Sequence, residues 1–161
     1  MAWSNPKTGA AQLRKITRLR PSLAIVLGSG FHQTMTWLRV DRRIPYERIP
    51  GFPKTRVSGH AGDVAIGIIG RTPVVVLNGR AHFYEGHEMA AVTHPIRVLA
   101  EFGLTDLLLT NSAGGINPRC RPGDFMALTE TPKFMGVAPL SGPGARARPR
   151  AVDLSPGSWS G

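Results

Sequence analysis

Cysteine is almost absent from this chain of 161 residues: Cys120 is the only one, so no disulfide can form within it. The longest apolar runs, LAIVL and VVVL, are far shorter than the roughly 20 residues that a membrane-spanning helix needs. The sequence contains no Asn-x-Ser/Thr acceptor for glycosylation, and its first 20 residues hold no apolar core of a secretion signal. Together these absences predict a cytoplasmic protein that does not cross a membrane.

Known metal-binding and nucleotide-binding patterns are lacking as well. The five histidines form no His-Glu-x-x-His motif, and a single cysteine excludes a Cys-x-x-Cys pair. The glycines of LGSG are followed by Gln33 where the dinucleotide fingerprint has a third glycine, and no Gly-Lys-Ser/Thr of a P-loop follows them. The sequence therefore predicts neither a bound metal nor an organic cofactor.

Acidic residues are scarce at the two ends of the chain, and this scarcity accounts for most of its net charge of +10. Residues 1–20 contain five basic side chains and no acid, and residues 143–161 contain three arginines against one aspartate. The segment between them has a net charge of only +3. A nucleic-acid-binding domain carries its positive charge on the folded surface that meets the phosphates, so nucleic-acid binding is kept only as a minor alternative.

Composition also suggests three segments. Residues 1–20 predict a basic N-terminal helix or extension, because apolar residues recur three apart over 8–19. Residues 21–142 alternate apolar runs with turns, as expected for one globular domain. Residues 143–161 consist mainly of Gly, Pro, Ser, Ala and Arg, which bury little surface on folding and predict a disordered tail.

The middle segment predicts an α/β fold, with a mixed, partly parallel β-sheet flanked by helices. Its continuous apolar runs favour a sheet buried on both faces. Five runs predict strands, the second and third joined by a tight hairpin: 22–30, 63–70, 72–79, 105–115 and 124–130.

Proline and glycine predict where the other elements begin and end. Three prolines between 39 and 57 predict irregular, extended structure there. After the hairpin a helix is expected, with Thr93 as its cap and Pro95 in its first turn. Gly103 is expected to end that helix.

The densest group of polar side chains lies in NGRAHFYEGH, directly after an apolar strand. Arg80 and His82 alternate with apolar residues, so at a strand's end they project from one face. A guanidinium can bind a phosphate through two parallel hydrogen bonds, an imidazole can donate a third, and Tyr84 extends the same face with a hydroxyl. The alternative is that Arg80 pairs with Glu85 or Glu88 and that Tyr84 covers an edge of the core.

Two glycine-rich turns after other strands favour the same kind of ligand. LGSG places Ser29 between glycines, where backbone N–H groups and a hydroxyl suit a phosphate oxygen. TNSAGGIN supplies small residues that leave room for a flat ligand, although either turn could be a plain connection. Because ligands bind at the carboxyl ends of strands in open α/β sheets, the three turns predict one phosphate or oxyanion pocket.

Five segments occur in the same order in a known family. VLGSG, IPGFPKTRVSGHAGD, NGRAHFYEGH, THPIRVLAEFG and TNSAGGINP resemble the trimeric purine nucleoside phosphorylases. The resemblance extends from about Ile25 to Pro143 and implies a phosphorylase-like fold. It also implies the activity of that family of pentosyltransferases, in which a purine (deoxy)nucleoside and inorganic phosphate give the free base and ribose 1-phosphate.

The same resemblance implies roles for individual residues. Arg80 and His82 are the catalytic pair that it implies. Tyr84 corresponds to a residue beside the ribose. Ala113 and Gly114 correspond to positions that line the purine. The phosphate-binding set that it implies consists of Ser29, His60, Arg80, His82 and the backbone of Ser112. Phosphate would be a co-substrate, no cofactor would be needed, and the protein would be a homotrimer of purine salvage.

The sequence also departs from the family's pattern. The resemblance covers only the N-terminal half of the family, so the fold is expected to be incomplete. The asparagine and glutamate that grip the purine in the family, and a histidine near the ribose 5′-hydroxyl, have no counterpart here. TETPKF stands where the family has Asp-His. The alternative is therefore a non-catalytic chain that binds phosphate or a partner subunit.

Overall fold

The structure is a computed structural model that describes residues 4–53 and 62–128 of the chain. The chain separates into two compact units, Met1–Ser112 and Ala113–Gly161. All helices and strands of the described residues belong to the first unit. The tail predicted from residue 143 lies outside the described residues.

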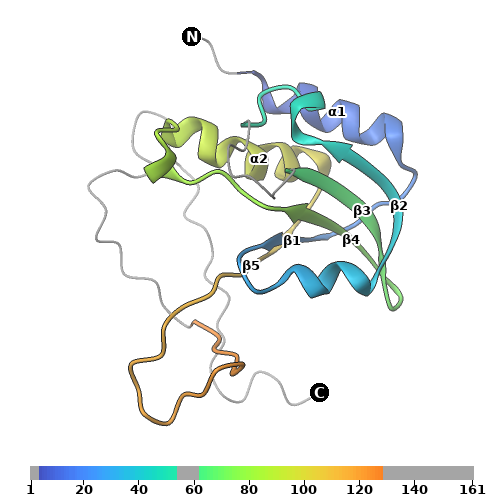
Figure 1. Ribbon diagram of the computed structural model, residues 1–161. Coiled ribbons are helices and arrows are strands. Elements are labelled where there is room, and N and C mark those ends of the chain that lie inside the picture. The colour runs from blue at the N-terminus through green and yellow to red at the C-terminus, as the bar shows by residue number, and fades with distance from the viewer. Residues whose placement is uncertain (1–3, 54–61, 129–161) are drawn as a thin grey trace. The chain divides into compact units, whose positions relative to one another are not determined.

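The first unit is built on a five-stranded sheet in the order β2-β3-β4-β1-β5 (Figure 1). β1 is parallel to both of its neighbours, whereas β3 runs antiparallel to both β2 and β4. The expected mixed, partly parallel sheet is therefore confirmed. The strands are β1 (Leu23–Leu27), β2 (Leu38–Pro45), β3 (Asp63–Ile69), β4 (Thr72–Asn78) and β5 (Asp106–Leu109).

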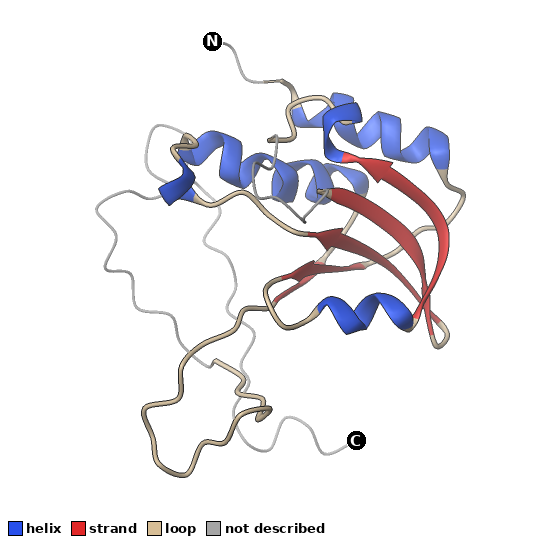
Figure 2. Cartoon of the chain, viewed as in Figure 1, coloured by secondary structure: helices blue, strands red, loops and turns tan. Residues whose placement is uncertain are grey.

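Two helices cover one face of this sheet, and a short 3₁₀ helix lies on the other face (Figure 2). The α-helices are α1 (Pro6–Ile16) and α2 (Met89–Phe102), and the 3₁₀ helices are η1 (His32–Thr36), η2 (Tyr46–Arg48) and η3 (Phe83–Glu85). The Asn5 side chain caps α1 by accepting a hydrogen bond from the Lys7 N–H. Gly9 allows α1 to approach α2, because a Cβ there would lie 3.0 Å from a methyl group of Val98.

Alternation along the strands divides the core into two layers. Val26, Val64 and the other residues on their side of the sheet point towards α1 and α2, where Leu13 is fully buried. Ile25 and the residues on the same side point towards η1, where Met35 is only partly buried. The thicker layer therefore lies between the sheet and the two α-helices.

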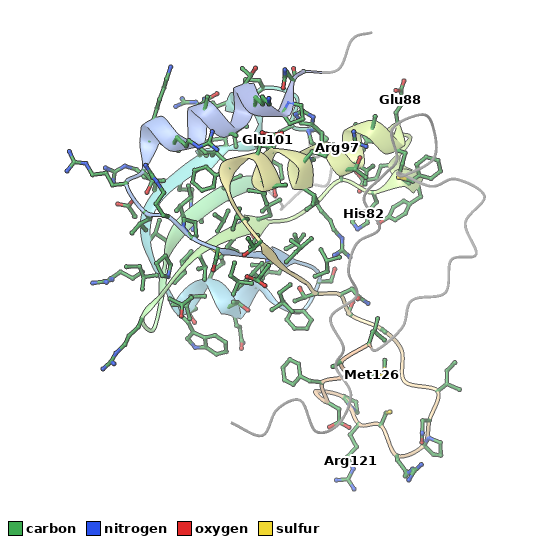
Figure 3. All side chains as sticks on the ribbon, turned by 180° about the vertical axis from the view of Figure 1, so that it is seen from behind. His82, Glu88, Arg97, Glu101, Arg121 and Met126 are labelled. Carbon is green, nitrogen blue, oxygen red and sulfur yellow. The ribbon has the colours of Figure 1, made fainter. Side chains whose placement is uncertain are left out.

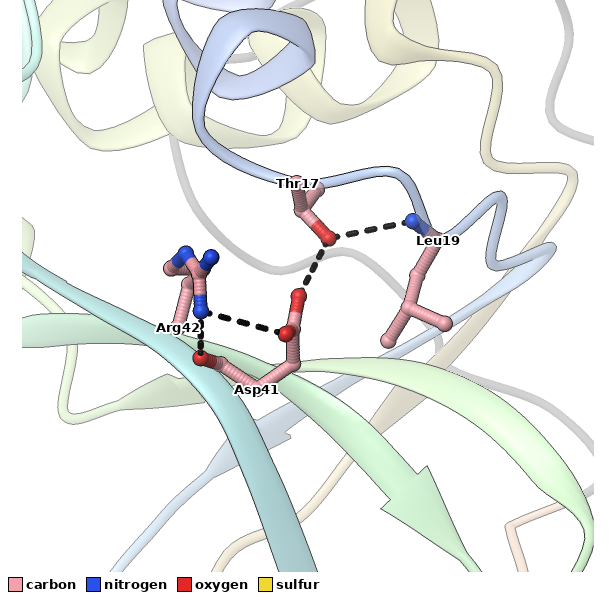
Figure 4. A network of polar contacts seen from close by, with 4 residues as sticks. All are labelled: Thr17, Leu19, Asp41 and Arg42. Carbon is pink, nitrogen blue, oxygen red and sulfur yellow. Dashed lines mark hydrogen bonds and ion pairs between the residues drawn. The ribbon is translucent and has the colours of Figure 1, made fainter.

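A polar network joins the end of α1 to β2, which is one edge of the sheet (Figure 4). The buried Thr17 hydroxyl donates to Asp41 Oδ2 at 2.7 Å and accepts from the Leu19 N–H at 3.1 Å. Asp41 lies at a register shift between Val40 and Arg42, and this bulge adds an extra residue to the strand. Asp41 also forms an ion pair with Arg42 at 3.2 Å.

We expect Thr17→Val to lower the free energy of unfolding by about 1–2 kcal/mol, because it leaves Asp41 Oδ2 and the Leu19 N–H without their partner. Urea unfolding followed by circular dichroism measures the change. Thr36→Val is the matched control, since its hydroxyl donates to an exposed carbonyl within η1. Equal losses in the two variants would contradict a connecting role for Thr17.

The helix after the hairpin begins earlier than expected. The prediction that Thr93 caps it is wrong: α2 begins at Met89 with Glu88 as its N-cap residue, and Pro95 lies inside the helix. Met89 and the two alanines after it are strong helix formers and extend the helix by a turn. The Thr93 hydroxyl instead donates to the Met89 carbonyl at 2.9 Å. Gly103 ends the helix in a left-handed conformation, as predicted.

Three strand predictions also need correction. The region from residue 39 is not irregular, since β2 extends to Pro45, a position that an edge strand tolerates. The run 105–115 is expected to be a buried strand that ends in a turn; the strand is confirmed over Asp106–Leu109, but it is exposed, and β1 is its one partner among the described residues. Residues 124–128 form no strand, and 129–130 lie outside the described residues. The hairpin between β3 and β4 is confirmed.

Candidate active site

The topology of the sheet brings three loops together at one edge. Leu27 at the end of β1 pairs with Asn78 at the end of β4, and Val26 pairs with Leu109 at the end of β5. Since the three strands are parallel, the residues that follow them emerge side by side. The predicted convergence of these turns, as far as Ser112, is therefore confirmed.

Gly28 holds two of these loops together. Its N–H donates to the Thr110 hydroxyl at 2.9 Å, and that hydroxyl donates to the Val26 carbonyl at 3.0 Å. A Cβ at Gly28 would lie 2.3 Å from the Thr110 carbonyl oxygen, so only glycine fits. This close approach fixes where the first and third loops begin.

A cavity of about 310 Å³ opens where the loops meet. Five of the residues predicted for the anion site line it, and five others do so as well. The lining residues are Leu27, Gly28, Ser29, His32, Gly79, Arg80, His82, Tyr84, Asn111 and Ser112. The cavity has room for a phosphate and part of a larger substrate.

Arg80 is held in this cavity by two hydrogen bonds. Its Nη1 donates to the Thr110 carbonyl at 2.8 Å, and its Nε donates to His82 Nε2 at 3.3 Å. Nη2 makes no hydrogen bond within the part of the chain that the structure describes. Arg80 therefore does not pair with Glu85 or Glu88, the alternative left open by the sequence, and Nη2 can bind an anion.

Glu85 orients His82 instead. Its Oε1 lies 2.8 Å from His82 Nδ1, and because a carboxylate can only accept, Nδ1 carries the proton. Nε2 of the neutral ring then has a lone pair, which is what the contact from Arg80 requires. Two independent contacts thus favour the same tautomer of His82. Figure 3 shows the side chain of His82 on the segment that leads into α2.

This tautomer changes what His82 offers a phosphate. Because the Nε2 lone pair accepts from Arg80 Nε, the neutral ring can accept a hydrogen bond from the P–O–H group of hydrogen phosphate once that contact opens. It donates from Nε2 only after protonation. Arg80 supplies a donor in either state. The pair therefore matches hydrogen phosphate, which presents both an O–H and negatively charged oxygens.

Burial acts to raise the pKa of Glu85, but the hydrogen bonds from His82 and the charges of His82 and His87 outweigh burial and lower it. A lowered pKa in the folded state stabilises the protein at pH values above the unfolded pKa, and this stabilisation is lost as the pH falls. We expect Glu85→Gln to reduce the free energy of unfolding at pH 7 and to have little effect at pH values where Glu85 is protonated. Urea unfolding as a function of pH tests this, and a loss independent of pH would contradict it.

Tyr84 covers one face of His82. The two rings stack with centroids 4.8 Å apart and planes inclined by 22°, while 82% of Tyr84 remains exposed. The tyrosine thus lies at the mouth of the cavity and is free to contact a substrate there. The alternative that Tyr84 caps the edge of the core is wrong, because it is exposed.

Some predicted residues are not placed by the structure. His60 lies outside the described residues. Ala113 and Gly114 belong to the second unit, so their role beside a purine stays a prediction. Among the described residues no group of three or more His, Cys, Asp or Glu could hold a metal ion, and no helix is long and apolar enough to span a membrane.

The sequence reasoning missed four residues around the cavity. His32 and Asn111 line it, Thr110 holds Arg80, and Glu85 holds His82. Only Glu85 left a signal, since it follows His82 by three residues and so returns to the same side of a helical turn. The contact between Arg80 and Thr110 joins residues 30 positions apart, and no local sequence pattern predicts it.

Comparisons with known proteins complete the description. Residues 22–159 match the family described as the phosphorylase superfamily. This chain belongs to that superfamily. The phosphorylase-superfamily chain is 42% identical over 123 residues to purine nucleoside phosphorylase 1 of Bacillus subtilis, covering 76% of its own length and 45% of that protein. It is 39% identical over 137 residues to purine nucleoside phosphorylase of Rattus norvegicus, covering 83% of itself and 47% of the relative.

Solved structures give the same result. The chain matches a purine nucleoside phosphorylase in complex with ribose-1-phosphate with a TM-score of 0.69 and 38% identity, over 74% of itself and 44% of that chain. It matches isoform 2 from Schistosoma mansoni, in complex with cytosine and ribose-1-phosphate, with a TM-score of 0.66 and 38% identity, over 74% and 42%. The family resemblance and the mixed α/β fold are confirmed. The chain spans about half the length of these relatives.

Proposed function

We propose that the chain provides the phosphate-binding part of a purine nucleoside phosphorylase site and takes part in the phosphorolysis of purine (deoxy)ribonucleosides. The observation that carries this proposal is that Arg80 and His82, which contact each other, line a cavity at the carboxyl ends of three parallel strands, with Glu85 bound to His82. Relatives named purine nucleoside phosphorylase, at about 40% identity, support the choice of substrate.

In this reaction an oxygen of hydrogen phosphate forms a bond to C1′ of the nucleoside while the bond from C1′ to the purine breaks. The proton of hydrogen phosphate ends on the departing base. Arg80 Nη2 and the Ser29 hydroxyl would hold the phosphate oxygens in line with C1′, and His82 Nε2 would accept its O–H. Positive charge that develops at C1′ would be stabilised by the anion held beside it.

The remaining roles follow from the resemblance alone. His60 and the Ser112 backbone would complete the phosphate contacts, and Tyr84 would lie beside the ribose. Ala113 and Gly114 would line the purine. We further propose a cytoplasmic homotrimer of purine salvage, with inorganic phosphate as co-substrate and no cofactor.

The test is phosphate-dependent release of hypoxanthine from inosine by the purified chain. We expect release that requires phosphate and that falls in Arg80→Ala but not in Arg39→Ala, which removes the same charge from the exposed edge of β2. Release independent of phosphate, or equal in the two variants, would contradict the proposed site.

One observation favours the alternative, a non-catalytic chain that binds phosphate or a partner subunit. Within residues 4–53 and 62–128, β5 pairs with β1 on one side only, and its three leucines are 42–61% exposed, although apolar strands of parallel sheets are normally covered. The same assay separates the two functions. Phosphate binding that depends on Arg80, without any release of hypoxanthine at high protein concentration, would favour the alternative.

A further inference from the structure

His87 makes a contact that neither the sequence motif nor the proposed reaction uses. It follows Gly86, whose left-handed conformation (φ 85°) reverses the chain after η3. His87 Nε2 then lies 3.4 Å from Glu85 Oε2. Both atoms are buried, and neither makes a hydrogen bond in the described part of the chain, so this contact is the polar interaction that the structure shows for each of them.

The two oxygens of Glu85 therefore face different histidines. Oε1 accepts from His82 Nδ1 at 2.8 Å, and Oε2 faces His87. The carboxylate is only 12% exposed, so water cannot readily replace a missing partner. A buried carboxylate oxygen without a donor is costly, and the group would rotate to regain one. A proton on His87 Nε2 would let this contact close to a hydrogen bond, which would keep the carboxylate in the plane that serves His82.

We propose that His87 is a positioning residue of the anion cavity: acting through Glu85, it holds His82 in the tautomer protonated at Nδ1, so that Nε2 faces the cavity. Second partners of this kind commonly fix the orientation and tautomer of a functional imidazole. The part of the inference that concerns phosphate affinity rests on the proposed function, whereas the tautomer of His82 does not.

Three substitutions separate a hydrogen-bonding role from simple packing. Gln places a side-chain N–H where His87 has Nε2, so His87→Gln should retain the contact. Asn places its N–H near the position of Nδ1 and cannot reach Oε2. Phe keeps the ring volume and removes the donor. If His87 acts only by packing, the Phe variant should be closest to the native protein in the tautomer of His82 and in phosphate affinity. If His87 acts by hydrogen bonding, the Gln variant should be closest in both.

The measurement is the ¹⁵N chemical shifts of the His82 ring nitrogens without phosphate, at about pH 8.5, where imidazoles are neutral. We expect the native chain and His87→Gln to show a protonated Nδ1 and a free Nε2. We expect His87→Phe and His87→Asn to show averaged shifts of two tautomers. If the Phe variant does not fold, the Asn variant provides the same comparison.

Phosphate affinity gives a second readout. We expect the Phe and Asn variants to bind phosphate about five-fold more weakly, as for loss of one hydrogen bond, and the Gln variant to bind normally. An unchanged tautomer in Phe and Asn, or a Gln variant that behaves like them, would overturn the inference. A native chain that shows the expected tautomers but binds no phosphate would refute the proposed function and leave the positioning role supported.

Discussion

Replacing Arg80 with alanine should weaken phosphate binding by about 10- to 100-fold, the largest loss of affinity expected for any single residue of the cavity. A hydrogen bond from a charged donor to an anion contributes about 1.5–3 kcal/mol, which corresponds to this range. The loss should be larger still if phosphate also displaces the contact between Arg80 Nε and His82, because Nε then donates to the ligand as well. Isothermal titration of the purified chain with inorganic phosphate measures the change.

Two further variants show whether the guanidinium or only its charge is responsible. Arg80→Lys keeps the charge but cannot donate to the Thr110 carbonyl and to the ligand in the same fork geometry, so it should fall between alanine and the native residue. Arg39→Ala removes one positive charge from an exposed position on β2 and should have little effect. Similar affinities in Arg80→Ala and Arg39→Ala would show that the anion binds elsewhere.

Gly28→Ala should destabilise the protein by at least about 3 kcal/mol, because the new Cβ would clash with backbone rather than with a side chain that can move. The nearest atoms are the Thr110 carbonyl oxygen at 2.3 Å and Asn111 Cα at 2.9 Å. Relief of the clash requires β1 and the loop after β5 to separate, which also breaks the hydrogen bond from the Gly28 N–H. Urea unfolding measures the loss of stability.

Gly30→Ala, two residues later, is the matched control. Its Cβ would meet no atom within 4 Å, but its φ of +87° disfavours a side chain, so we expect a loss of only about 1–2 kcal/mol. If Gly28→Ala lost no more free energy than Gly30→Ala, the structure would relieve the clash at Gly28 at little cost. The close approach of the two loops would then not determine how the cavity is built.

The sequence predicted those parts of the fold that depend on neighbouring residues. The hairpin between β3 and β4 and the end of α2 at Gly103 follow from local turn chemistry, and both are confirmed. The predicted start of α2 was wrong, because the sequence does not distinguish a proline in the first turn of a helix from a proline inside it. Packing of the helix determines which of the two occurs. The exposure of β5 was missed for a similar reason, since the sequence of a strand does not say how many neighbours it has.

In the candidate site too, the sequence predicted what neighbouring residues determine and missed what contacts between distant residues determine. The sequence brought Arg80 and His82 together, because their spacing alone places them on one face of a strand's end. It could not decide which basic side chain Glu85 would contact, because that depends on the Thr110 carbonyl, which binds Arg80 from another loop. Once Arg80 is held there, Glu85 contacts His82 and His87 instead.

We expect phosphate to bind in the cavity between the loops after β1, β4 and β5. A titration of the ¹⁵N-labelled chain with inorganic phosphate, followed through its backbone amide shifts, tests this binding site. We expect saturable changes at Gly28, Ser29, Arg80 and Ser112, all of which line the cavity, and no such changes in Arg80→Ala. Changes confined to the basic residues around the end of α1, or the same changes in Arg80→Ala, would show that phosphate binds elsewhere.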